Sequence, residues 1–103
     1  MELTEANFSE NLNTKFSVSV ADEQLEIELV EVKGYRSEHH EQQGMERFSI
    51  YFQGTPEFIL PQGLYSMGHA RMGSFEIFLV PIKSQETGIQ YEAVFNYFRE
   101  QEQ

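Results

Sequence analysis

The chain has 103 residues, with nine Phe, five Tyr and no Cys. This length fits a single domain over residues 1–103, and the lack of Cys excludes disulfides, thiolate metal sites and thiol catalysis. Acidic residues outnumber basic ones 17 to 7, and the net charge of −10 opposes binding to nucleic acid and to membrane surfaces. The first residues lack the pattern of a secretory signal, and no apolar run is long enough to cross a membrane, so we expect a cytoplasmic protein.

Residues 4–11 predict a short amphipathic helix. Thr4 is a suitable N-cap, Glu5 lies near the positive end of the helix dipole, and Asn11 favours its end. Three apolar residues about one turn apart are expected to dock on the rest of the domain: Leu3, Phe8 and Leu12.

Period-two alternation of apolar and polar residues then predicts six strands, at 15–20, 25–32, 46–53, 64–69, 74–82 and 89–98. Within 25–32 the apolar phase changes at Leu29-Val30, which indicates a bulge or a move between two sheets. The loop 70–73 fits a hairpin, with Gly73 able to take a positive φ. Short turns between antiparallel strands are typical of an all-β fold, here a small antiparallel barrel or a sandwich of about six strands.

The strand 74–82 is apolar on both faces, with Phe75, Ile77 and Leu79 on one face and Phe78, Val80 and Ile82 on the other. A small domain rarely buries both faces of one strand. Either the helix covers the second face in a monomer, with Phe78 packing on Leu3 and Phe8, or that face contacts another molecule.

The second alternative predicts binding to a protein partner or self-association through this strand and the last one. Pro81 suits an edge or a bulge because it lacks an N–H, and an edge there would accept a strand from another chain. The acidic surface favours a basic rim on the partner. The candidate interaction residues are Phe78, Val80, Pro81, Tyr91 and Tyr97.

The sequence contains no pattern that predicts catalysis or a cofactor. His39 and His40 lie between glutamates, but side chains of adjacent residues diverge and no second cluster completes a metal site. The chain lacks the G-x-S-x-G of serine hydrolases and any Gly-rich phosphate loop, and it has a single aspartate, Asp22. We therefore expect a non-enzyme. The alternative is a small-ligand-binding barrel, which would hold a polar-lined cavity near Tyr65, His69 and Glu76.

A resemblance to a known family is carried by the stretches 25–32, 60–65, His69, 72–82 and 91–96. They resemble a family of small bacterial proteins that is known only as a domain of unknown function, and the resemblance covers about residues 3–95. Members of that family look like neighbours of phage-tail-collar-type proteins in bacterial gene clusters. The resemblance implies an accessory or assembly role in a tail-like or fibre-like structure, and it implies no catalytic residue.

Overall fold

The computed structural model describes residues 2–35 and 45–98, of which positions 45, 97 and 98 are described for the backbone only. The predicted helix is confirmed as α1 (Glu5–Glu10), with the Thr4 hydroxyl accepting a hydrogen bond from the Asn7 N–H at 3.1 Å. Asn11 forms the C-cap, and Asn13 adopts a positive φ of 66° that asparagine tolerates. In the described part of the chain no helix is long and apolar enough to cross a membrane.

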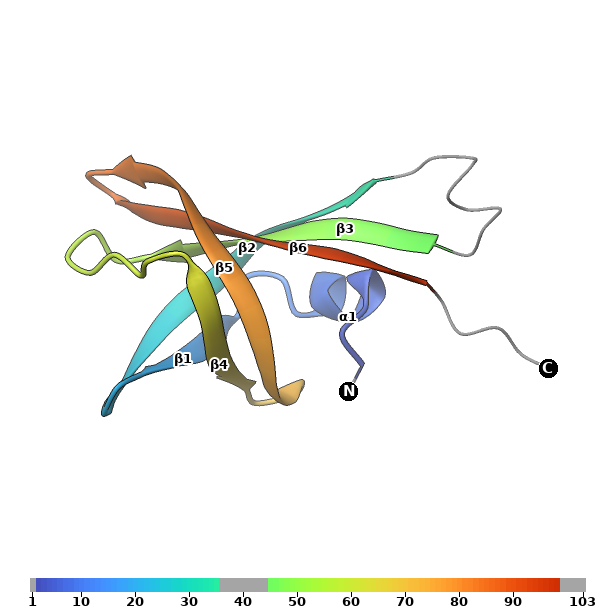
Figure 1. Cartoon of the computed structure of the whole chain (residues 1–103), viewed down its shortest axis with the longest axis horizontal. Helices are drawn as coiled ribbons and strands as arrows, with labels where there is room; N and C mark the ends of the chain where they lie inside the picture. Colours follow the sequence, from blue (N-terminus) through green and yellow to red (C-terminus); the bar gives the residue numbers. More distant parts are fainter. Residues whose placement is uncertain (1, 36–44, 99–103) are drawn as a thin grey trace.

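Six antiparallel strands follow, as the alternation predicts, and they close into a barrel rather than a sandwich (Figure 1). The ring order is β1-β2-β3-β6-β5-β4, so four pairs of consecutive strands are antiparallel neighbours, and the connection from β3 to β4 joins strands that do not pair. The strands are β1 (Lys15–Val20), β2 (Glu23–Tyr35), β3 (Met45–Gly54), β4 (Gly63–His69), β5 (Gly73–Gln85) and β6 (Gly88–Phe98). Residues 36–44, between β2 and β3, lie outside the described residues.

The strands differ in length, so the barrel has an extension. Strand β1 pairs with β2 only from Glu23 to Glu28, whereas β2 continues to Tyr35 beside β3, and β3 pairs with β6 as far as Phe98. Figure 1 shows β2, β3 and β6 running past the ring as a three-stranded sheet, with α1 beneath it. The phase change at Leu29-Val30 is a confirmed irregularity, because the β2–β3 register shifts between Leu29 and Glu31.

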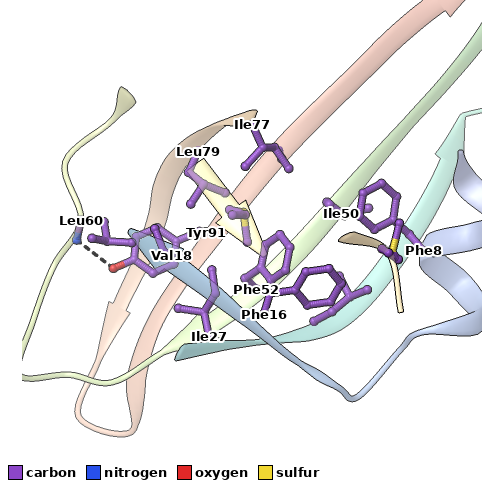
Figure 2. Packing of buried hydrophobic residues seen from close by; sticks show 14 of the residues in the cluster. Phe8, Phe16, Val18, Ile27, Ile50, Phe52, Leu60, Ile77, Leu79 and Tyr91 are labelled. Atoms are coloured by element: carbon purple, nitrogen blue, oxygen red, sulfur yellow. Dashed lines mark hydrogen bonds between the residues drawn. The ribbon is translucent and has the colours of Figure 1, made fainter. Parts of the chain in front are cut away.

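Aromatic and aliphatic side chains fill the barrel (Figure 2). The centre contains Phe16 and Phe52, whose rings meet edge to face with centroids 5.3 Å apart. At the end of the ring below the extension, Phe8 of α1 completes the core. Leu3 packs against the core as predicted, but Leu12 does not: its side chain is 39% exposed, because the helix ends before it.

Two hairpin turns differ in how well their residues suit the backbone. In the β1–β2 turn, Ala21 adopts a φ of +53°, a region that costs a residue with a Cβ about 1 kcal/mol. In the β4–β5 turn, Gly73 adopts a φ of +81°, and an added Cβ would meet nothing within 4 Å. The predicted positive φ of Gly73 is thus confirmed, and its requirement for glycine is purely conformational.

Exchanging alanine and glycine at these two positions should change the free energy of unfolding in opposite directions. Ala21→Gly should raise the free energy of unfolding by roughly 0.5 kcal/mol, because relief of the positive-φ strain exceeds the entropy that glycine loses on folding. Gly73→Ala should lower it by about 1 kcal/mol. Urea denaturation of both variants measures the two changes, and a shift of the same sign in both would contradict this account.

Candidate interaction surface

An exposed apolar cluster lies on the outside of the barrel, where β4 and β5 pair. Ile77 and Leu79 point into the core, so the alternation of β5 turns Phe78 outward, and 49% of its side chain is exposed. Leu64 of β4 is the register partner of Phe78 and is 62% exposed. Val80 follows on the same face of β5 and is half-buried. We call Leu64, Phe78 and Val80 the apolar outer face.

Carboxylates flank the apolar outer face on both sides. Glu76 precedes Phe78 by two residues on the same side of β5, and Glu92 of β6 is the register partner of Val80. Both follow from strand alternation, which brings residues i and i+2 to one face. Part of the net charge of −10 therefore lies beside the apolar outer face, and this face would attract a positively charged group.

The helix does not cover this face, so the alternative in which Phe78 packs on Leu3 and Phe8 is wrong. Phe8 instead contacts inward-facing rings, with the centroid of Phe75 at 6.1 Å and that of Phe95 at 5.5 Å. These rings belong to the opposite face of β5 and to β6. The helix therefore completes the core and leaves Phe78 at the surface.

One of the five candidate interaction residues, Tyr91, lies elsewhere than expected. Tyr91 is 1% exposed and belongs to the core, where its hydroxyl accepts a hydrogen bond from the Leu60 N–H at 2.9 Å (Figure 2). Tyr91 faces inward because alternation on β6 puts its neighbour Glu92 outside, so it is not available as a surface anchor. Pro81 pairs with Tyr91 and is half-buried, so β5 is not an edge at this point. The side chain of Tyr97 lies outside the described residues.

The expectation of a bulge at Pro81 is confirmed. The β5–β6 register shifts between Pro81 and Lys83, which leaves Ile82 without a partner on β6 and 45% exposed. Leu64 was not among the predicted residues, because its place opposite Phe78 depends on the exact length of the β4–β5 turn.

A polar cluster occupies the outer face of the extension. Glu92 accepts hydrogen bonds from the Ser49 hydroxyl at 2.8 Å and from the Tyr51 hydroxyl at 3.2 Å. Tyr35 lies 3.1 Å from Ser49 through its hydroxyl. The hydrogen bond to Ser49 and a second one to Tyr51 lower the pKa of Tyr35, whereas the bond with Tyr35, burial and the charge of Glu92 raise the pKa of Tyr51.

This tyrosine–glutamate cluster also holds two cations close to one ring. The Lys33 ammonium and the Arg47 guanidinium lie 5.8 Å and 5.9 Å from the centroid of Tyr35, within cation–π range. The hydroxyls of Tyr35, Ser49 and Tyr51 and the Glu92 carboxylate are hydrogen-bonded to one another, and Ser49 is fully buried, whereas the buried Nε of Arg47 has no hydrogen-bond partner among the described residues. The cluster therefore ties β2, β3 and β6 together across their outer face.

His69 is a structural residue at the end of β4, beside the segment that joins α1 to β1. Its Nδ1 accepts hydrogen bonds from the backbone N–H groups of Arg71 and Met72 at 3.0 Å and 3.1 Å, so its proton lies on Nε2. Nε2 donates to the hydroxyl of Thr14 at 2.8 Å, and the imidazole lies 4.2 Å from the ring of Phe16, centroid to centroid. Burial, with a smaller contribution from the charge of Arg71, lowers the pKa of His69.

The residues expected around a ligand cavity are not brought together. On β4, Tyr65 points inward near one end and donates its hydroxyl proton to the Pro61 carbonyl, while His69 closes the other end. Glu76 points outward. A hollow of about 370 Å³ does lie on the outer face of β1, β4 and β5, where small side chains such as Ser17, Ser66 and Ser74 line the sheet. It is an open surface depression.

Among residues 2–35 and 45–98, no three His, Asp or Glu side chains gather in a way that would hold a metal ion. His39 and His40, whose flanking glutamates suggested a metal site, lie outside the described residues.

A family described as "Domain of unknown function (DUF6916)" matches residues 3–95. The chain belongs to this family. The match covers α1, strands β1 to β5 and β6 as far as Phe95. It agrees with the resemblance to a family of unknown function drawn from the strand and turn motifs. No curated protein and no solved structure matches the chain.

The buried hydroxyl of Tyr91 gives a stability prediction for the DUF6916 core. Tyr91→Phe leaves the Leu60 N–H without its buried acceptor, which should lower the free energy of unfolding by about 1–3 kcal/mol. Tyr65→Phe is the control, since its hydroxyl bond to the Pro61 carbonyl is exposed and its loss should cost about 0.5 kcal/mol. Chemical denaturation measures both, and equal costs would contradict the assigned role of Tyr91.

The neutral state of His69 gives a pH prediction. Because its pKa is lower in the folded than in the unfolded chain, where it is near 6.5, its contribution is complete above that value. The contribution is lost as the pH falls from 6.5 through the lowered folded pKa, since the unfolded chain then binds more protons.

His69→Asn tests this, because an asparagine oxygen can accept the same two N–H bonds without titrating. All other groups titrate alike in both proteins, so the difference in their unfolding free energies isolates His69. That difference should shrink between about pH 8 and about pH 5. A difference that stays constant over this range would show that His69 is not held neutral by the fold.

Proposed function

We propose that this DUF6916 chain is a non-catalytic interaction protein, and that its apolar outer face binds a protein with an apolar centre and a basic rim. The observation that supports the proposal is the pairing of Leu64 with Phe78, two large apolar side chains that are about half exposed or more and adjacent on neighbouring strands. Aromatic side chains supply much of the energy of an interface once they are desolvated.

Charge complementarity supports the chemistry of the partner. Glu76 and Glu92 border the apolar outer face, and lysine or arginine around an apolar patch on the partner would pair with them. Such charges at the rim speed association and select against acidic surfaces more than they add affinity. A basic partner is therefore favoured over a second acidic copy at this face.

Members of this family look like neighbours of phage-tail-collar-type proteins in bacterial gene clusters, and this supports a proposal about the biological role. In this role the protein is an accessory or assembly factor of a tail-like or fibre-like structure, and the apolar outer face binds another component of that structure. Such a role needs a compact, stable domain with an exposed binding face, and no chemistry.

The packing favours this proposal over the alternative of a small-ligand-binding barrel. A barrel that binds a ligand inside needs an interior space, and here Phe16, Phe52 and Tyr91 occupy the centre. Catalysis is likewise disfavoured by the arrangement of side chains. Ser49 donates to Glu92, and the three hydrogen-bond partners described for His69 are Thr14, Arg71 and Met72, all structural.

A pair of charge-matched variants tests the proposal. Phe78→Asp places a charge in the apolar outer face, while Leu12→Asp adds the same charge at an exposed apolar residue after α1. Both should stay folded by circular dichroism, since neither side chain is buried. The partner is the protein that the wild type and Leu12→Asp retain from extracts of the source organism and that Phe78→Asp loses by at least about tenfold, the loss expected for an interface anchor.

A basic partner also implies weaker retention at high salt. If the wild type and Phe78→Asp retain the same proteins, or if Phe78→Asp unfolds, the apolar outer face is not the binding surface.

A further inference from the structure

The extension has a free edge along β6. Residues Ala93–Phe98 pair with β3 on one side, while β5 pairs with β6 only at Glu92 and before it. Within the described part of the chain, no strand pairs with the other side of this segment, which we call the β6 edge. Its backbone therefore presents N–H and C=O groups that can pair with another strand.

Aromatic packing keeps β5 away from the β6 edge. The ring of Phe8 contacts both Phe75 of β5 and Phe95 of β6, so the two strands separate around it. The helix itself lies toward the far side of the sheet: the carboxylate of Glu5 fills the space beside Gly34 on β2, and the Glu5 N–H is directed to Glu46 on β3. Figure 1 shows β5 leaving β6 at a steep angle while β6 continues along β3.

The two edges of the extension differ in chemistry. On β2, the other edge, Glu31 and Lys33 place charges on the outer face, a register irregularity follows Leu29, and the Glu5 side chain lies against Gly34. Charges, irregularities and covering side chains are the devices that prevent unwanted strand pairing. The six residues of the β6 edge carry no charge, no Pro and no Gly, and Val94 is 61% exposed.

We propose that two copies of this chain pair antiparallel through their β6 edges about a two-fold axis. The three-stranded extensions then form one continuous six-stranded sheet. In this sheet, Val94 and Asn96 of one copy lie across the two-fold axis from Val94 and Asn96 of the other. This inference goes beyond the proposed partner surface, since it uses the backbone of β6 and not the outer face of β4 and β5.

A second copy suits this edge because the edge is uncharged. Each chain carries a net charge of −10, so two copies repel one another over most of their surfaces. The β6 edge offers six uncharged residues over which the backbones can approach. Added salt screens the remaining repulsion, so the dimer should strengthen with ionic strength, whereas the salt-bridged complex at the apolar outer face should weaken.

Cysteine cross-linking tests the geometry, because the chain has no Cys of its own. Val94→Cys and Asn96→Cys, alone and mixed, should form an intermolecular disulfide in at least one combination under glutathione oxidation, since residues facing across paired strands have Cβ atoms close enough. Lys33→Cys, at the β2 edge of the same sheet, is the control and should stay monomeric.

Sedimentation equilibrium tests the energetics with charge-matched variants. Val94→Lys with Asn96→Lys puts like charges across the two-fold axis and should raise the dimer dissociation constant by roughly tenfold or more. Glu31→Lys changes the net charge by the same amount at the β2 edge and should leave the dissociation constant within about twofold. Both variants alter exposed side chains, so circular dichroism should report the wild-type fold.

A wild-type chain that stays monomeric at about millimolar concentration and high salt overturns the proposal, as that concentration detects even weak association. So does a dimer that cross-links equally well through Lys33→Cys, or one that is insensitive to the two lysines. None of these outcomes bears on the apolar outer face, which is tested by Phe78→Asp.

Discussion

The architecture depends on one aromatic side chain. Phe8 projects from α1 and meets the rings of Phe16, Phe48, Phe75 and Phe95, which come from four different strands. This contact completes the core where the ring ends and the extension begins. It also sets the separation of β5 from β6. A barrel of this length without the helix would expose a row of apolar rings at its end, at a cost of about 1.5–3 kcal/mol for each side chain left in water. The helix has only six residues and makes few hydrogen bonds of its own, so this burial is what stabilises it.

Local patterns predicted much of this fold. Period-two alternation located all six strands because each has a core side and a solvent side, and the phase change at Leu29-Val30 located the irregularity that lets β2 pass from the ring into the extension. Alternation describes a single strand, however, and says little about which strands become neighbours. The ring order, and the choice of a barrel over a sandwich, follow from long-range contacts that the six segments do not encode one by one.

The candidate surface was predicted in part for the same reason. The outward position of Phe78 follows from the two apolar faces of its strand. Its partner Leu64 does not, because a loop of 70–73 would put Leu64 opposite Leu79, whereas the observed turn is one residue shorter and puts it opposite Phe78. Tyr91 was misplaced because an aromatic residue at strand period fits either face. The Leu60 N–H supplies a polar partner for its hydroxyl inside the core.

Closure of the ring also constrains how the chain reaches its native state. Ser17 on β1 must find Gly68 on β4, a separation of 51 residues, and Ser49 must find Glu92 across 43. Such distant pairings cost loop entropy before they yield any packing, which places a small β barrel among the slower two-state folders, on the order of milliseconds to seconds. During synthesis the first hairpin, β1 and β2, emerges with no neighbour to cover its apolar side. Productive folding must therefore wait for β6, which leaves the ribosome after the other five strands of the ring.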